Sequence, residues 1–184
     1  MTTDQAELDT YPVTEQRWDD LAALFEKPGP RGGRQDTANC WCSVWRYPMR
    51  SAESNKAALR SLVTDHDPPG LLAYRDGEAV GWVSVAPREQ FASLLRGSQF
   101  KPRDDDSGVF VISCFAVDRS VRGRGVGRAL VDAAVRYALE RGATAVEAFP
   151  GDPPDYKGKL DWFLDYGFEV MRTVGKRTVV RYTA

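Results

Sequence analysis

The chain has 184 residues, of which 42% are hydrophobic and 28% charged, and its net charge is −1. This length suits one domain with a substantial core, and the near-neutral charge excludes a global field that would attract nucleic acid or a membrane surface. The apolar runs fall far short of the roughly 20 residues of a membrane helix, and residues 1–5 lack the character of a signal peptide. We therefore expect a cytoplasmic protein, a monomer or a homodimer, that recognises its partners locally.

The N-terminal part predicts two helices joined by an aromatic segment. A short edge strand at 11–13 precedes a helix with one apolar face, which ends at Pro28. Residues 31–39 are polar and glycine-rich, which indicates a flexible connection. The aromatic patch at 40–48 then fits either a strand or a loop that lines a pocket, and a second helix begins near Ser51.

The chain contains three cysteines, Cys40, Cys42 and Cys114. We expect them to be reduced thiols, because no export signal precedes them. A zinc site at the first two would need two further ligands, and only Cys114 and His66 are available. We therefore expect no metal.

The middle of the chain predicts a β-hairpin. Residues 71–74 and 79–85 alternate as strands do, and Gly77 lies in the turn between them, where a positive φ is needed. A short helix at 88–95 follows. The acidic run at 104–106 indicates an exposed loop.

The second half centres on a strand, a turn and a helix. Val109–Val117 is β-branched and aromatic, as in a buried strand, and it leads to residues 122–128, which we call the glycine turn. Apolar residues then recur at helical spacing until Gly142, and a strand at 144–149 is expected to lie parallel to the first. The last predicted elements are a helix at 160–166 and an antiparallel pair at 168–171 and 178–182.

The glycine turn has the chemistry of an anion site. Its glycines let the backbone approach a ligand, and the first N–H groups of the following helix point out of its positive end. A nucleoside-triphosphate loop would need Gly-Lys followed by Ser or Thr, which is absent. A dinucleotide fingerprint that starts at Gly123 or Gly125 would meet Arg128 or Leu130 where glycine or alanine is needed.

The remaining pattern, formed by Arg122, Gly125 and Gly127, resembles the acetyl-CoA pyrophosphate loop of the GNAT (GCN-five-related) N-acetyltransferases. The order of strand, turn, helix and strand, followed by the Gly167-Phe168 pair, is also similar to that family over about residues 71–182. The resemblance implies an α/β (α+β) GNAT fold, with a mixed, mostly antiparallel central sheet that splays between strands four and five and is flanked by helices.

The resemblance also implies how the chain is organised. We expect a single acetyltransferase domain over residues 1–184, with a cofactor-binding core at about 71–182. Residues 11–66, with their helices and aromatic loop, would shape the acceptor site.

The resemblance implies acetyl-CoA as co-substrate. Backbone groups of the fourth strand would pair with the pantetheine arm, and the turn would hold the pyrophosphate. The residues implied are Phe115, Ala116 and Val117 in the strand, and Arg122, Gly123, Arg124, Gly125, Val126, Gly127 and Arg128 in the turn. Each arginine is alternatively a surface residue.

Catalytic residues are harder to assign. The family's usual general acid is a tyrosine four residues before the Gly-Phe pair, a position that Phe163 holds here, and a phenyl ring cannot protonate a thiolate. Tyr156 and Tyr166 are candidate substitutes, with solvent as an alternative proton source and core packing as the alternative for Tyr166.

The candidate general base is Glu147, which sits in an otherwise apolar strand where burial would raise its pKa. The alternative is an outward-facing glutamate or one paired with an arginine.

The sequence thus predicts an acetyl-CoA-dependent N-acetyltransferase, an acyltransferase that moves an acetyl group directly to a primary amine of a small molecule or peptide. Nucleic acid and membranes are not expected partners. Phe163 favours one alternative, a non-catalytic acyl-CoA-binding or sensor domain. An RNA-binding module based on Arg-Gly repeats is disfavoured by the net charge of −1 and by the helix after Gly127.

Overall fold

The computed structural model describes residues 8–29, 37–48, 50–64, 68–96, 100 and 107–184. Residues 1–5, His66 and the acidic run at 104–106, about which the sequence makes predictions, lie outside this part. Within the described ranges, no helix combines the length and the apolar character needed to cross a bilayer.

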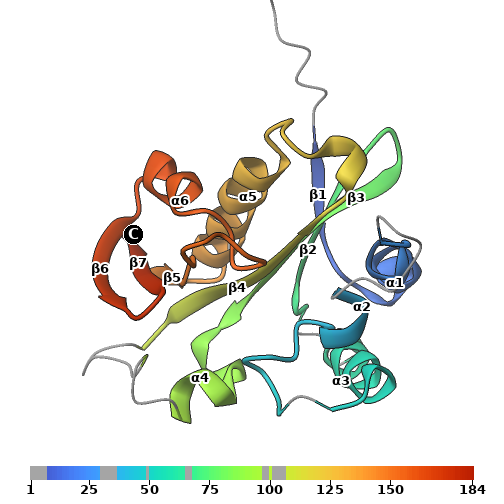
Figure 1. The fold of residues 1–184 in the computed structure, drawn as a ribbon, viewed down its shortest axis with the longest axis horizontal. Helices are drawn as coiled ribbons and strands as arrows, with labels where there is room; N and C mark the ends of the chain where they lie inside the picture. The colour runs from blue at the N-terminus through green and yellow to red at the C-terminus, as the bar shows by residue number, and fades with distance from the viewer. Residues whose placement is uncertain (1–7, 30–36, 49, 65–67, 97–99, 101–106) are drawn as a thin grey trace, which may run out of the picture.

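One sheet organises the described part of the chain (Figure 1). Its strands are β1 (Asp9–Pro12), β2 (Gly70–Arg75), β3 (Glu78–Pro87), β4 (Val109–Val117), β5 (Ala145–Ala148), β6 (Glu169–Val174) and β7 (Arg177–Thr183). Their order in the sheet is β1-β2-β3-β4-β5-β7-β6, with β4 and β5 parallel and the other neighbours antiparallel. The predicted mixed, mostly antiparallel sheet is confirmed.

The helices largely follow the apolar periodicity of the sequence. They are α1 (Trp18–Glu26), α2 (Thr37–Cys40), α3 (Ala52–Thr64), α4 (Ala92–Arg96), α5 (Val126–Glu140) and α6 (Leu160–Tyr166), with short 3-10 turns at Glu15–Arg17, Arg88–Gln90 and Arg119–Val121. The helix expected at 88–95 is interrupted at Phe91, whose side chain is fully buried.

One expected connection contains a helix. The prediction of a flexible connection at 31–39 is wrong for residues 37–39, which belong to α2. The Thr37 hydroxyl donates to the Phe25 carbonyl at 3.2 Å, and the Trp41 N–H donates to the Thr37 carbonyl at 3.0 Å. A tertiary contact with α1 therefore stabilises a helix that the local sequence does not predict. The aromatic patch that follows is a loop, in which Trp41 and Cys42 adopt positive φ.

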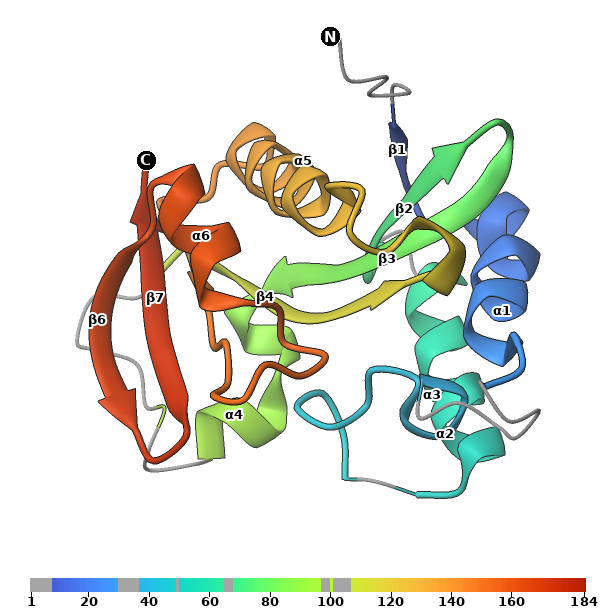
Figure 2. The same ribbon diagram turned by 45° about the horizontal axis from the view of Figure 1, so that its top comes forward.

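Helices cover both faces of the sheet (Figure 2). α5 and α6 pack on one face, which we call the α5 face. On the opposite face, the α1 face, α1 and α3 cover one end and α4 the other. Because side chains alternate along a strand, β4 directs Phe115 to the α5 face and its neighbours Cys114 and Ala116 to the α1 face.

β4 and β5 separate part of the way along β4. They pair only from Val109 opposite Ala145 to Ile112 opposite Ala148. The following residues 150, 153 and 154 are prolines, which cannot donate to a neighbouring strand. Residues 113–117 of β4 consequently have an edge that β5 does not cover, at the place where the splayed strands were predicted.

Candidate active site

A cleft of about 600 Å³ opens beside the uncovered edge of β4. This main cleft is lined by Phe115, Val117, Val121, Arg122, Gly123, Gly125, Val126, Gly127, Arg128, Pro154, Asp155, Tyr156, Gly158, Lys159 and Trp162. Its volume lies within the range of about 300–1,000 Å³ typical of ligand pockets. The structure thus brings together the predicted cofactor residues except Ala116 and Arg124, which lie outside the lining.

The backbone of the glycine turn is shaped for an anion. Gly123 and Gly125 have φ of 77° and 82°, in the left-handed region that favours glycine. A Cβ at Gly125 would meet no protein atom within 4 Å and would point into open space. The first bond of α5 runs from the Ala129 N–H to the Gly125 carbonyl at 3.1 Å, so the preceding N–H groups of the helix have no helical acceptor. This end of α5 suits a phosphate.

Gly127 has a different reason to be glycine. A Cβ there would lie 2.4 Å from the indole ring of Trp162 on α6. Only glycine lets α5 and α6 approach this closely, and the approach places the indole in the wall of the main cleft. No motif in the sequence marks Trp162 as a residue of the cleft.

The turn's arginines have three different settings. Arg128 pairs with Asp165 at 2.7 Å and with Asp161 at 3.0 Å, so two carboxylates on α6 already neutralise its charge. Arg122 donates from Nε to the Val117 carbonyl at 3.2 Å. Arg124 is exposed and lines neither the main cleft nor the cavity described next. Backbone amides, more than side chains, therefore supply the donors of this turn.

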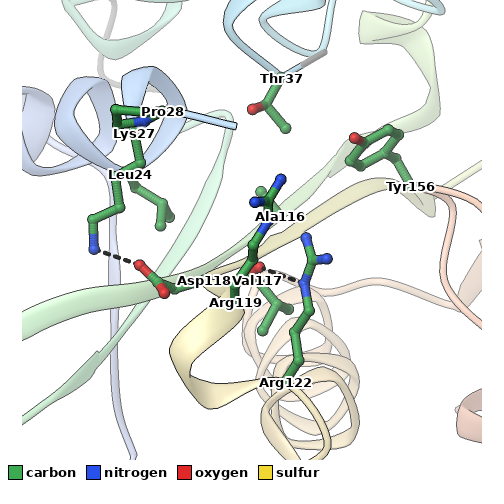
Figure 3. Close-up of a pocket in the computed structure, with 10 residues that line it drawn as sticks. All are labelled: Leu24, Lys27, Pro28, Thr37, Ala116, Val117, Asp118, Arg119, Arg122 and Tyr156. Carbon is green, nitrogen blue, oxygen red and sulfur yellow. Dashed lines mark hydrogen bonds and ion pairs between the residues drawn. The ribbon is translucent and has the colours of Figure 1, made fainter. Parts of the chain in front are cut away.

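A smaller cavity of about 80 Å³ adjoins the main cleft at Val117, Arg122 and Tyr156 (Figure 3). This side cavity is lined by Leu24, Lys27, Pro28, Thr37, Ala116, Val117, Asp118, Arg119, Arg122 and Tyr156. Lys27 pairs with Asp118 across it. No local motif marks the residues from α1 and α2, because only the tertiary fold brings them to the end of β4.

Tyr156 stands at the junction of the two cavities. It lines both, and 39% of it is exposed. Its carbonyl accepts a hydrogen bond of 2.6 Å from the Phe115 N–H, one of the strand amides expected to face the cofactor. The loop that carries Tyr156 therefore covers part of the edge that β5 leaves open.

The other aromatic candidates lie in the core. Phe163 is fully buried and packs edge-on against Phe115 and Phe168, with ring centroids 6.0 and 5.3 Å apart. Tyr166 packs against Phe168 and Tyr182 and lines neither cavity. Of the candidate acids, Tyr156 is thus the one that lines the main cleft.

Glu147 is buried, with 6% of its surface exposed. It pairs with Arg88, which is also buried, and its Oε1 lies 3.3 Å from Nη1 of Arg181. The carboxylate lines neither cavity. This geometry matches the arginine-paired alternative, and a role as general base remains a prediction.

The three cysteines are free thiols. Cys42 and Cys114 are buried on the α1 face, and the interaction between their thiol groups raises the pKa of Cys42 and lowers that of Cys114. Neither lines the main cleft or the side cavity. Across the described residues, no group of three or more His, Cys, Asp or Glu side chains is placed to hold a metal ion.

Comparison with known proteins gives two partial relatives. An uncharacterised N-acetyltransferase of Methanocaldococcus jannaschii is 40% identical over 58 residues, which are 32% of this chain and 25% of that protein. Mycothiol acetyltransferase of Propionibacterium freudenreichii is 32% identical over 108 residues, or 56% of this chain and 30% of that protein. The chain therefore matches less than a third of the length of either relative.

A solved structure extends the likeness to nearly the whole chain. The protein yncA of Salmonella typhimurium, determined with its cofactor acetyl-CoA, superimposes with a TM-score of 0.59 at 12% identity, covering 96% of this chain and 93% of that one. At this identity the match shows the fold alone. A model of the acetyltransferase (GNAT) family matches residues 34–156, which include β2 to β5, the glycine turn and Tyr156. The chain belongs to the GNAT acetyltransferase family.

Proposed function

We propose that this chain is an acetyl-CoA-dependent N-acetyltransferase that moves an acetyl group directly to a primary amine of a small molecule or peptide. The observation that carries the proposal is the main cleft, which joins an uncovered strand edge to the positive end of α5. A strand edge suits the amide-containing pantetheine arm, and a helix N-terminus suits the pyrophosphate.

The cleft fits this co-substrate by its chemistry. The amides of Gly125, Val126 and Gly127 would hold the pyrophosphate, while Phe115 and Val117 would offer strand backbone to the arm. The Phe115 N–H is engaged by the Tyr156 carbonyl, so cofactor pairing there requires this loop to release it. Binding would therefore move residues around 155–158.

Acetyl-CoA supplies an activated acyl carbon and a thiolate leaving group. Tyr156 is the residue proposed to give the proton to that thiolate, because it lines both cavities. An amine in the side cavity would approach from the α1 face of β4, opposite the glycine turn. Direct transfer is supported by the position of the thiols, since neither Cys42 nor Cys114 lines the main cleft or the side cavity.

The test has two stages. Calorimetry with acetyl-CoA and with CoA measures cofactor binding, and thiol release in the presence of a panel of amines measures transfer. Binding together with amine-dependent thiol release is expected. No binding of either ligand would overturn the assignment of the cleft.

Phe163 motivates a second candidate function. Its fully buried ring occupies the position where the family usually has its acid. A non-catalytic acyl-CoA sensor would bind acetyl-CoA in the main cleft without releasing thiol on any amine. That outcome of the same experiment would favour the sensor over the transferase.

A further inference from the structure

The side cavity carries an unbalanced charge. Its lining includes three cationic side chains, Lys27, Arg119 and Arg122, and one carboxylate, that of Asp118. Figure 3 shows both guanidinium groups directed into the space between Lys27 and Tyr156. The cavity therefore has more positive than negative groups at the place where an acceptor would approach β4.

The carboxylate in this cavity is already neutralised. Asp118 pairs with Lys27 and accepts hydrogen bonds from the Ser120 N–H at 2.8 Å and the Ser120 hydroxyl at 2.7 Å. Burial opposes its ionisation, but the bonds from Lys27 and Ser120 outweigh burial and lower the pKa of Asp118 to about 2. Asp118 and Lys27 thus cancel each other, and the two arginines determine the cavity's charge.

Neither arginine has a carboxylate partner among the described residues. Arg122 donates from Nε to a backbone carbonyl, which leaves its charge uncompensated. Other arginines of the described residues do pair with carboxylates, among them Arg88, Arg128, Arg136, Arg177 and Arg181. Arg119 and Arg122 thus present two guanidinium groups in one small cavity, and such forks suit a carboxylate or a phosphate.

We propose that the acceptor amine carries an anionic group, a carboxylate or a phosphate, which Arg119 binds together with Arg122 in the side cavity. This inference rests on the proposed function and narrows its acceptor class. A cavity of about 80 Å³ holds a group of only a few heavy atoms, which suits an anionic head group. Polycationic acceptors such as polyamines are disfavoured, because like charges repel.

The phosphates of the cofactor are a less suitable occupant. The amides of the glycine turn line the main cleft, whereas Arg119 lines only the side cavity. That cavity also includes Leu24, Pro28 and Thr37, which lie on the α1 face. Of the glycine turn, the side cavity's lining includes only Arg122, so an anion held there would meet the arginine side chains and not the amides of residues 123–128.

The test compares acceptors that differ only in charge. Amino acids and aminoalkyl phosphates are paired with their uncharged amides or esters, and kcat/KM is measured by thiol release for the wild type, Arg119→Gln and Arg136→Gln. Arg136→Gln is the matched control, because it removes the same charge from an exposed position on α5 outside both cavities. Binding of the N-acetylated acids and amides to the CoA-loaded protein is measured in parallel and needs no turnover.

We expect the wild type to prefer acids to their amides by at least about tenfold. Arg119→Gln should remove this preference without changing the KM for acetyl-CoA, and Arg136→Gln should keep it. Equal use or equal binding of acids and amides, or a preference for polyamines, would overturn the inference and leave the transferase intact. If Arg119→Gln weakened the binding of acetyl-CoA but not of 3′-dephospho-acetyl-CoA, Arg119 would bind the 3′-phosphate of the cofactor. That result would also overturn the inference. Cofactor binding without turnover on any amine would instead overturn the proposed function.

Discussion

The two cavities beside β4 are built in different ways. The main cleft takes its anion-binding groups from one continuous segment, in which the end of a strand, two left-handed glycines and the start of α5 follow one another. The side cavity instead combines Lys27 and Thr37 with Asp118 and Tyr156, which come from segments far apart in the chain. Backbone amides dominate the first, and side chains dominate the second.

This difference assigns the two cavities different roles in the proposed enzyme. A backbone site for phosphate needs only glycine at the right φ and a free helix end, so many chains with different acceptors can share it. A site made of side chains changes whenever one loop changes. The main cleft would therefore bind the co-substrate that the family shares, and the side cavity would bind the acceptor that is particular to this protein.

The largest effect is expected at the glycine turn. Gly125→Val would place a branched side chain in the open space that a Cβ at this position enters. We expect acetyl-CoA affinity to fall at least about 1,000-fold, measured by calorimetry, because the pyrophosphate and the side chain cannot share that space.

Backbone strain is controlled by a matched variant. Gly142 has a φ of 80°, close to that of Gly125, and its Cβ would also meet no atom within 4 Å, but it lies beyond the far end of α5. Gly142→Val should carry the same strain and keep cofactor affinity. Equal loss in both variants, or none in Gly125→Val, would contradict the assignment of the turn.

A second expected effect concerns the buried ion pair on the α1 face. Glu147→Gln would remove the carboxylate charge that pairs with the buried Arg88, so the free energy of unfolding should fall by about 3 kcal/mol. Activity per folded molecule should stay within about twofold, because Glu147 lines neither cavity. Urea unfolding and kcat/KM measure the two quantities.

Glu169→Gln, on an exposed position of β6, is the control and should change neither quantity. A Glu147→Gln variant that remained stable, lost turnover and lost the rise of its rate with pH would restore Glu147 as general base.

The same contrast, between continuous and distant segments, determines which features could be predicted from the sequence. The strand, the glycine turn, α5 and the parallel pairing of β5 follow from local periodicity and from glycines whose φ must be positive. The partner of Glu147 does not, because Arg88 lies 59 residues away and only the sheet brings the two together. The predicted connection at 31–39 failed at Thr37 for the same reason, since its helix depends on a bond to α1.

A smaller effect should distinguish the two tyrosines near α6. Tyr156→Phe removes the hydroxyl at the junction of the cavities, so kcat should fall by about 10- to 100-fold while the Kd for acetyl-CoA changes less than about twofold. Tyr166→Phe is the matched control, because Tyr166 packs against Phe168 and Tyr182 outside both cavities. Unchanged turnover in Tyr156→Phe would exclude Tyr156 as the general acid.

The smallest expected effect is on stability at the side cavity. Asp118→Asn removes the charge that pairs with Lys27 and weakens the cap on Ser120, so the free energy of unfolding at pH 7 should fall by about 1 kcal/mol. The pKa of Asp118 is lowered to about 2 in the folded protein, against about 3.9 in an unfolded chain. Its contribution is therefore complete above about pH 4 and disappears as the pH falls through 2, where urea unfolding should give the variant and the wild type the same stability.

Asp132→Asn is the control, because it breaks an exposed pair with Arg136 on α5 and should lower the free energy of unfolding by less than about 0.5 kcal/mol. Equal losses in the two variants would mean that the side cavity's ion pair is no stronger than an ordinary surface pair, and that its arrangement depends on packing instead.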